Sequence, residues 1–153
     1  MSTNPTRPPR REPPGPIWNP EAAANWSLPF SPAFGSYLHM LNWRTLGEPE
    51  KARAAFVWFL LSLGMLLASL LIVVAYPDSP VSGMGGRIAS FVYLAVWYLT
   101  FARRQMEFVK KNYGDGYPRK KWGGALAVGV ACLLAYFGAA LMIGIVMGIA
   151  KGP

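Results

Sequence analysis

The stretch Arg103–Trp122, RRQMEFVKKNYGDGYPRKKW, is the only long polar interval between two apolar runs, and it holds seven of the 15 basic residues. The run after it, 123–150, has no charged residue, and neither does an earlier run, 54–76. A helix needs about 20 apolar residues to cross the hydrocarbon core of a bilayer, so both runs are long enough. Only 14% of the chain is charged, against about 25% in a typical soluble domain. The sequence therefore predicts an all-α integral membrane protein.

A third span is expected between these two. The apolar run 88–102 has only 15 residues, which make about 22 Å of helix. A helix that begins near Met84 and lets Arg103 extend to the headgroups can nevertheless cross the bilayer. We therefore expect three transmembrane helices, at about 54–76, 84–102 and 123–150, in one membrane domain, 48–153. The second helix is expected to continue to about Asn112, where Gly114 can end it.

The basic residues alternate along the chain in a way that predicts the orientation of the spans. Six precede the first span, one lies in the first loop, seven lie in the second loop and one follows the third span. The positive-inside rule then places the N-terminus and the second loop in the cytosol and the C-terminus outside. The second-loop residues are predicted to fix this topology and to contact lipid headgroups: Arg103, Arg104, Lys110, Lys111, Arg119, Lys120 and Lys121.

Residues 1–24 are rich in proline and arginine, and they are predicted to form a disordered cytosolic tail. They offer too little apolar surface to offset the entropy of ordering. Prolines and charges also interrupt any signal-peptide core, so we expect the N-terminus to stay attached. The pieces PTRPPR (5–10) and PPGP (13–16) could be ligands of a proline-binding module, while a solvated tail near an anionic membrane surface is the simpler interpretation.

Residues 25–47 are predicted to lie in the membrane interface. Ser31-Pro32 is typical of a helix start, because serine caps a helix N-terminus and proline suits its first turn. One apolar face follows, made by Phe34, Tyr37, Leu38 and Leu41. The helix would run from Pro32 to Leu46 and be about 22 Å long, too short to span a bilayer. An amphipathic helix on the interface is therefore expected; a re-entrant hairpin, whose backbone would have to be shielded by protein, is the alternative.

The third span has a pattern of small residues, Ala140, Gly144 and Gly148, at every fourth position. Such spacing lets two helices approach closely in lipid, so these residues are predicted to pack against another helix. Packing against the chain's own first two spans is the favoured interpretation, and a homo-oligomeric interface is the other.

The sequence offers few groups for chemistry. It has one histidine, one cysteine and seven acidic residues, and no acid lies inside a predicted span. His39 has no partner ligands for a metal, so we interpret it as an ordinary residue of the interfacial helix. No catalytic residues, cofactor site or metal site are predicted. The net charge of +8 is placed beside the spans, so no nucleic-acid partner is expected.

Two stretches resemble known sequences. Asn25–Gly47, NWSLPFSPAFGSYLHMLNWRTLG, resembles the aromatic, proline-interrupted segment that precedes the spans in a group of small bacterial inner-membrane proteins without an established activity. The loop FVKKNYGDGYPRKKW (108–122) is similar to one that recurs in such proteins. The resemblance implies a bacterial origin and a location in the inner membrane, and it implies no site residues.

These observations together favour a non-enzymatic, multi-pass inner-membrane protein that acts through contacts, as an accessory, scaffold or inhibitor-type subunit. Its expected partners are the lipid bilayer and either another membrane protein or further copies of itself. A small homo-oligomeric channel or transporter is the alternative. Transport has little support from the sequence, since ion-coupled carriers usually place an ionisable group inside the membrane.

Overall fold

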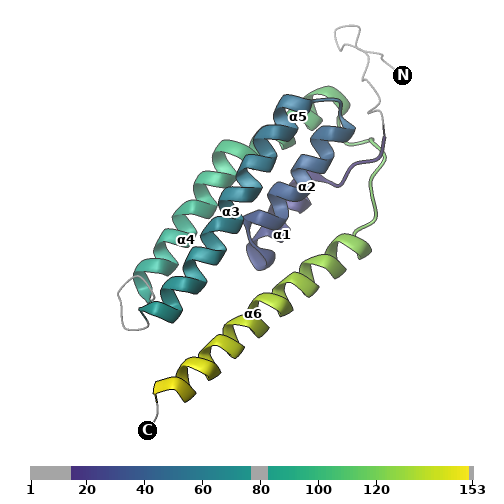
Figure 1. Ribbon diagram of the computed structural model, residues 1–153. Coiled ribbons are helices and arrows are strands. Elements are labelled where there is room, and N and C mark those ends of the chain that lie inside the picture. Colours follow the sequence, from purple (N-terminus) through teal and green to yellow (C-terminus); the bar gives the residue numbers. More distant parts are fainter. Residues whose placement is uncertain (1–14, 77–82, 152–153) are drawn as a thin grey trace, which may run out of the picture.

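The chain folds into helices joined by short connections (Figure 1). The computed structural model describes residues 15–76 and 83–151; the predicted tail 1–14 and part of the first loop, 77–82, lie outside the described residues. Within that part no β-strand forms, only an isolated bridge between Ile17 and Arg119. Two helices are long and apolar enough to cross a membrane, α3 (Pro49–Ala75) and α6 (Gly123–Lys151). The all-α prediction is confirmed, with two candidate spans rather than three.

The predicted second span belongs to a continuous helical rod. It consists of α4 (Met84–Trp97), the π-helical segment η1 (Tyr98–Ala102) and α5 (Arg103–Tyr113). The rod runs antiparallel to α3. The Lys51 ammonium near the start of α3 lies over the Phe108 ring, and Ser62, further along α3, bonds the Tyr93 hydroxyl. The rod ends where the sequence predicts, because Gly114 adopts a φ of +67° that favours glycine.

The prediction of a disordered tail over 1–24 is wrong for residues 15–24. Ile17 is fully buried, and α1 begins at Pro20 and ends at Phe30. The Asn19 side chain accepts hydrogen bonds from the first backbone N–H groups of α1, and Pro20 suits its first turn. Composition missed this because the segment gains its order from contacts with distant parts of the chain.

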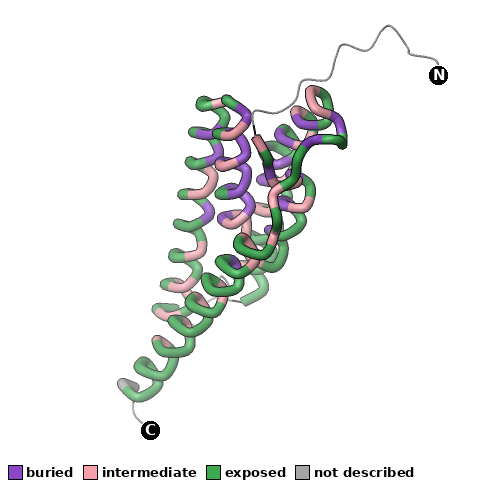
Figure 2. Tube along the Cα trace, turned by 90° about the vertical axis from the view of Figure 1, so that its right-hand side faces the viewer, coloured by how far each residue is buried: buried purple, intermediate pink, exposed green. Residues whose placement is uncertain are grey.

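The helix predicted over Pro32–Leu46 forms with nearly those boundaries, and its place at the membrane interface stays a prediction. The helix α2 runs from Pro32 to Thr45. It is packed on several sides, against α1, α3 and the rod, and eight of its 14 residues are buried. Only a few side chains, such as Tyr37 and Arg44, are exposed. The helices α1 and α2 form a hairpin, and Figure 2 shows the buried positions concentrated at that end of the molecule.

Two residues make the hairpin tight. Ser31 alone joins the two helices, in a backbone conformation with φ of +96° that glycine normally adopts. Its side chain makes no capping bond, so the predicted serine cap is absent. Gly35 lies where α2 approaches both α1 and α4, and a Cβ there would overlap the Ser27 hydroxyl and approach the Trp97 ring to 2.7 Å.

The helix α6 is attached at few points. Near its start, Gly129 lies against Phe30 and Phe34 of the hairpin, where a Cβ would meet both rings at 3.2 Å. Further along, the Tyr136 hydroxyl lies 3.2 Å from the Ser69 hydroxyl of α3. The hairpin tip therefore lies between the first turns of α6 and the rest of the bundle (Figure 1).

The favoured packing of the small residues against the chain's own spans is not what the structure has. Ala140 is half-buried, but Gly144 and Gly148 are exposed, and a Cβ at either glycine would meet nothing within 4 Å. The helix continues beyond its contact with α3 at Tyr136, and its two glycines there face open space within the described part of the chain.

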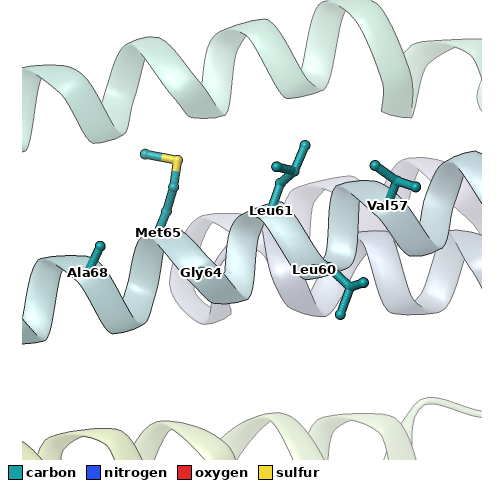
Figure 3. Close-up of a pocket in the computed structure, with 6 residues that line it drawn as sticks. All are labelled: Val57, Leu60, Leu61, Gly64, Met65 and Ala68. Carbon is teal, nitrogen blue, oxygen red and sulfur yellow. The ribbon is translucent and has the colours of Figure 1, made fainter.

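The outer face of α3 is also open. A shallow apolar groove of about 570 Å³ lies along it, and Figure 3 shows the residues that line it. The lining residues repeat on one helical face: Val57, Leu60, Leu61, Gly64, Met65 and Ala68. This face is opposite the one, with Ala55 and Ser62, that packs into the bundle.

Candidate functional site

A buried polar network joins the hairpin to the rod. The Gln105 amide nitrogen on α5 donates to the backbone carbonyl of His39 at 2.9 Å, which fixes the orientation of the amide. Its oxygen then accepts from the Asn42 amide at 3.1 Å and from His39 Nδ1 at 2.6 Å. Because the acceptor oxygen cannot donate, the proton of the neutral imidazole is on Nδ1. All three side chains are fully buried.

Asn42 extends the network to the N-terminal segment. Its side-chain oxygen accepts from the Trp18 backbone N–H at 3.0 Å, and its amide donates to the Trp18 carbonyl at 2.8 Å. The Asn42 amide therefore bonds both backbone groups of Trp18, as a paired residue in a neighbouring β-strand would. One buried amide thus connects the chain before α1, the helix α2 and, through Gln105, the rod.

Aromatic rings from the rod enclose the network. The Trp97 ring centroid lies 6.0 Å from that of His39, and the Phe101 centroid lies 5.6 Å from it, both edge-to-face. The Trp97 indole N–H donates to the Ser36 hydroxyl at 2.7 Å. The one polar group of the Trp97 side chain is therefore satisfied, and the surrounding medium has a low polarity that strengthens the hydrogen bonds inside it.

The π segment sets which residues face the hairpin. Trp97, Phe101, Gln105 and Val109 are spaced by four, and all are buried. In an α-helix of 3.6 residues per turn, residues eight apart would differ by about 80° in direction. The wider turns of η1 offset this drift and bring Gln105 onto the same face as Trp97. Without η1, Arg104 would point more nearly toward His39, and a buried charge without a partner is costly.

One atom of the network has no partner. His39 Nε2 is buried and makes no hydrogen bond within the described chain. Burial lowers the pKa of His39 from 6.5 to about 4, and the Gln105 hydrogen bond only partly opposes this. The imidazole is therefore neutral at pH 7 and offers a bare acceptor lone pair. The network itself contains no carboxylate or nucleophile beside it.

The predicted headgroup-contacting residues lie apart from this network, on the surface. Arg103 pairs with Glu107 at 2.9 Å, and both side chains are mostly exposed. Such an exposed pair adds little stability. Lys120 lies 4.3 Å over the Trp18 ring, and Arg119 lies over the Tyr117 ring. The remaining four are exposed, and none of their side chains makes a described contact, although the Lys121 backbone carbonyl accepts from the Trp18 indole N–H: Arg104, Lys110, Lys111 and Lys121.

Sequence reasoning missed all three members of the network. In the sequence His39 has no partner nearby, because Gln105 is 66 residues away, and Gln105 itself lies in a charged interval. The signal that could have found them is the four-residue spacing from Trp97 to Val109, which continues one buried face across the boundary between apolar and charged sequence.

Scans against protein-family models, curated proteins and solved structures found no match. The geometry of the network indicates a positioning role. It contributes hydrogen bonds between elements and presents one acceptor atom, Nε2 of His39. Among the described residues no group of three or more potential metal ligands is close together.

The depressed pKa of His39 predicts how stability depends on pH. The unfolded chain takes up a proton near pH 6.5, but the folded chain does so only near pH 4. The free energy of unfolding is therefore highest above pH 6.5, where His39 is neutral in both states. It decreases by at most about 3 kcal/mol as the pH falls to 4, because the unfolded chain then binds the proton more tightly. Unfolding in detergent should be followed by tryptophan fluorescence between pH 7 and 4.

The matched variant is His39→Asn, whose amide nitrogen can replace Nδ1 as the donor to Gln105. The variant has no titrating group at this position, so its stability should fall less steeply over the same range. Parallel curves for the two proteins would show that His39 is not buried as a neutral imidazole.

Proposed function

We propose that the chain is a three-span membrane protein with its N-terminus and the α5–α6 connection in the cytosol. Three observations support this. The helix α3 and the rod run antiparallel, and α6 runs in the same direction as α3 (Figure 1). The uncharged part of the rod ends at Ala102, close to where the uncharged part of α3 begins, since the Phe101 ring lies 6.0 Å from the Trp58 ring. The π segment also keeps Arg104 turned outward from the core, toward the headgroup region.

In this orientation the α1–α2 hairpin enters the membrane from the cytosolic side and returns. Gly129, which its tip contacts, lies six residues inside α6, or about 9 Å below the start of that helix. Irregular backbone is tolerated at such depth only when protein shields it and its polar groups are bonded. At the tip the Ser31 N–H donates to the Ser27 carbonyl and the Ser31 carbonyl accepts from Phe34, and Ser31 itself is half-buried.

A labelling experiment tests this topology. In a Cys132→Ser background, single cysteines replace Met84, which is 68% exposed at the start of α4, or Lys111, which is exposed near the end of α5. With intact cells and a membrane-impermeant maleimide, Met84→Cys should react at once. Lys111→Cys should react only after the membrane is permeabilised. Equal reaction of both positions from one side would rule out the three-span arrangement.

We propose further that the protein acts in a bacterial inner membrane without catalysis, by binding another membrane-embedded chain. The open surface of α6 is the observation that supports this role. From Phe137 to Ile149 all its large apolar side chains except Ile143 are exposed, and Gly144 and Gly148 leave its backbone open to close approach. A helix in lipid associates through such close contacts. The partner is a second copy of this chain or a different membrane protein.

The experiment compares two changes on α6. The double variant Gly144→Leu/Gly148→Leu fills the small-residue face, while Val146→Leu adds bulk at an exposed position on another side. Native mass spectrometry of chains extracted into nanodiscs should show the wild type and Val146→Leu with an additional bound chain. The double variant should appear alone.

Retention of the same assembly by the double variant would exclude this face as the contact. A strictly monomeric, partner-free wild type would exclude the proposed function itself. Ion conductance by a homo-oligomeric assembly in planar bilayers would favour the alternative of a small channel.

A further inference from the structure

Residues 15–18 form a segment, here called the N-terminal strap, that is clasped between α2 and the connection leading into α6. The Ile17 N–H donates to the Pro118 carbonyl at 3.2 Å, and the Lys120 N–H donates to the Ile17 carbonyl at 2.9 Å. The Ile17 side chain is fully buried. This pairing joins residues about one hundred positions apart, and no topological requirement of three spans calls for it.

Trp18 makes the remaining contacts of the N-terminal strap. Its backbone is bonded on both sides by the Asn42 amide, and its indole N–H donates to the Lys121 carbonyl at 3.2 Å. The Lys120 ammonium lies 4.3 Å from the centre of its ring. A cation over an indole adds about 0.5–1 kcal/mol at an exposed site. The strap is thus held by five hydrogen bonds, one cation–π contact and the buried Ile17 side chain.

The strap reaches α6 by two routes. The first is direct, because the strap binds residues 118–121 and α6 begins at Gly123. The second passes through α1, which begins two residues after the strap and ends at Phe30, against Gly129 of α6. Further along α6, its side chains make one hydrogen bond to the described part of the bundle, between the Tyr136 and Ser69 hydroxyls.

We propose that the N-terminal strap is a cytosolic control segment that sets the position of α6, so that withdrawal of the strap releases the first half of that helix. Two packed contacts change together in this step, the strap–loop pairing and the contact of Phe30 with Gly129. Packed contacts of this kind can carry energetic coupling between distant sites. The consequence for partner binding rests on the proposed function of α6, whereas the coupling is a property of the single chain.

The native Cys132 provides the reporter, because it is the one cysteine of the chain and is exposed on α6. Spin labels at Cys132 and at an introduced Arg87→Cys on α4 measure the position of α6 relative to the rod in nanodiscs. Ile17→Asp places a charge at the buried strap position. Pro16→Asp places the same charge at the neighbouring exposed position and is the matched control.

The wild type and Pro16→Asp should give one narrow distance distribution. Ile17→Asp should lose that peak and give a broad, shifted distribution. A second pair of labels, Val57→Cys with Arg87→Cys in a Cys132→Ser background, reports on α3 and the rod and should not change. An unchanged Cys132 distance in Ile17→Asp would overturn the proposal, whatever the assembly state of the protein.

If Ile17→Asp changes the distances of both label pairs, the bundle itself is disrupted. The milder variant Trp18→Phe then tests whether the strap is coupled to the position of α6. It keeps the ring under Lys120 and removes only the indole bond to Lys121. It should broaden the Cys132 distance alone. A narrow wild-type distance in Trp18→Phe would then refute the coupling, while the mass measurement on α6 variants separately judges the contact surface.

Discussion

The Gln105 amide is the contact on which the arrangement of this chain depends. It binds two side chains and one carbonyl of α2, and it can do so only because the π segment turns it to the same face as Trp97. In a buried site a partly bonded amide costs about 1–3 kcal/mol for each unsatisfied group. The network therefore favours one register of the rod against α2 and disfavours the alternatives.

The rest of the architecture follows from that register. With α2 fixed, Gly35 allows α1 and Trp97 to approach closely, and the hairpin tip reaches Gly129 of α6. Asn42 uses its remaining hydrogen-bonding groups to hold Trp18, so the strap and the second loop are joined to the same core. The molecule is accordingly compact at one end, where polar bonds cross between elements, and open at the other, where apolar helices diverge.

The sequence predicts the helices better than their contacts. Ser31-Pro32, Pro49 and Gly114 mark helix ends that the structure has at or next to these positions, because the backbone preferences of proline and glycine are local. The burial of Ile17, His39 and Gln105 could not be predicted in this way, since each depends on a residue more than 60 positions distant. The open face at Gly144 could not be predicted either, because the spacing of small residues does not indicate which helix packs against them.

Hydrogen–deuterium exchange of the backbone amides tests the central claim most directly, that the Gln105 network seats the α1–α2 hairpin. The comparison is between Gln105→Leu and Asn112→Leu, because the Asn112 amide bonds only to its own helix, at the Phe108 carbonyl. Buried, bonded amides exchange only when the structure opens. Peptides covering 20–45 should be protected in the wild type and Asn112→Leu and should exchange faster in Gln105→Leu, with α3 unchanged. Equal protection of the hairpin in all three proteins would contradict the account.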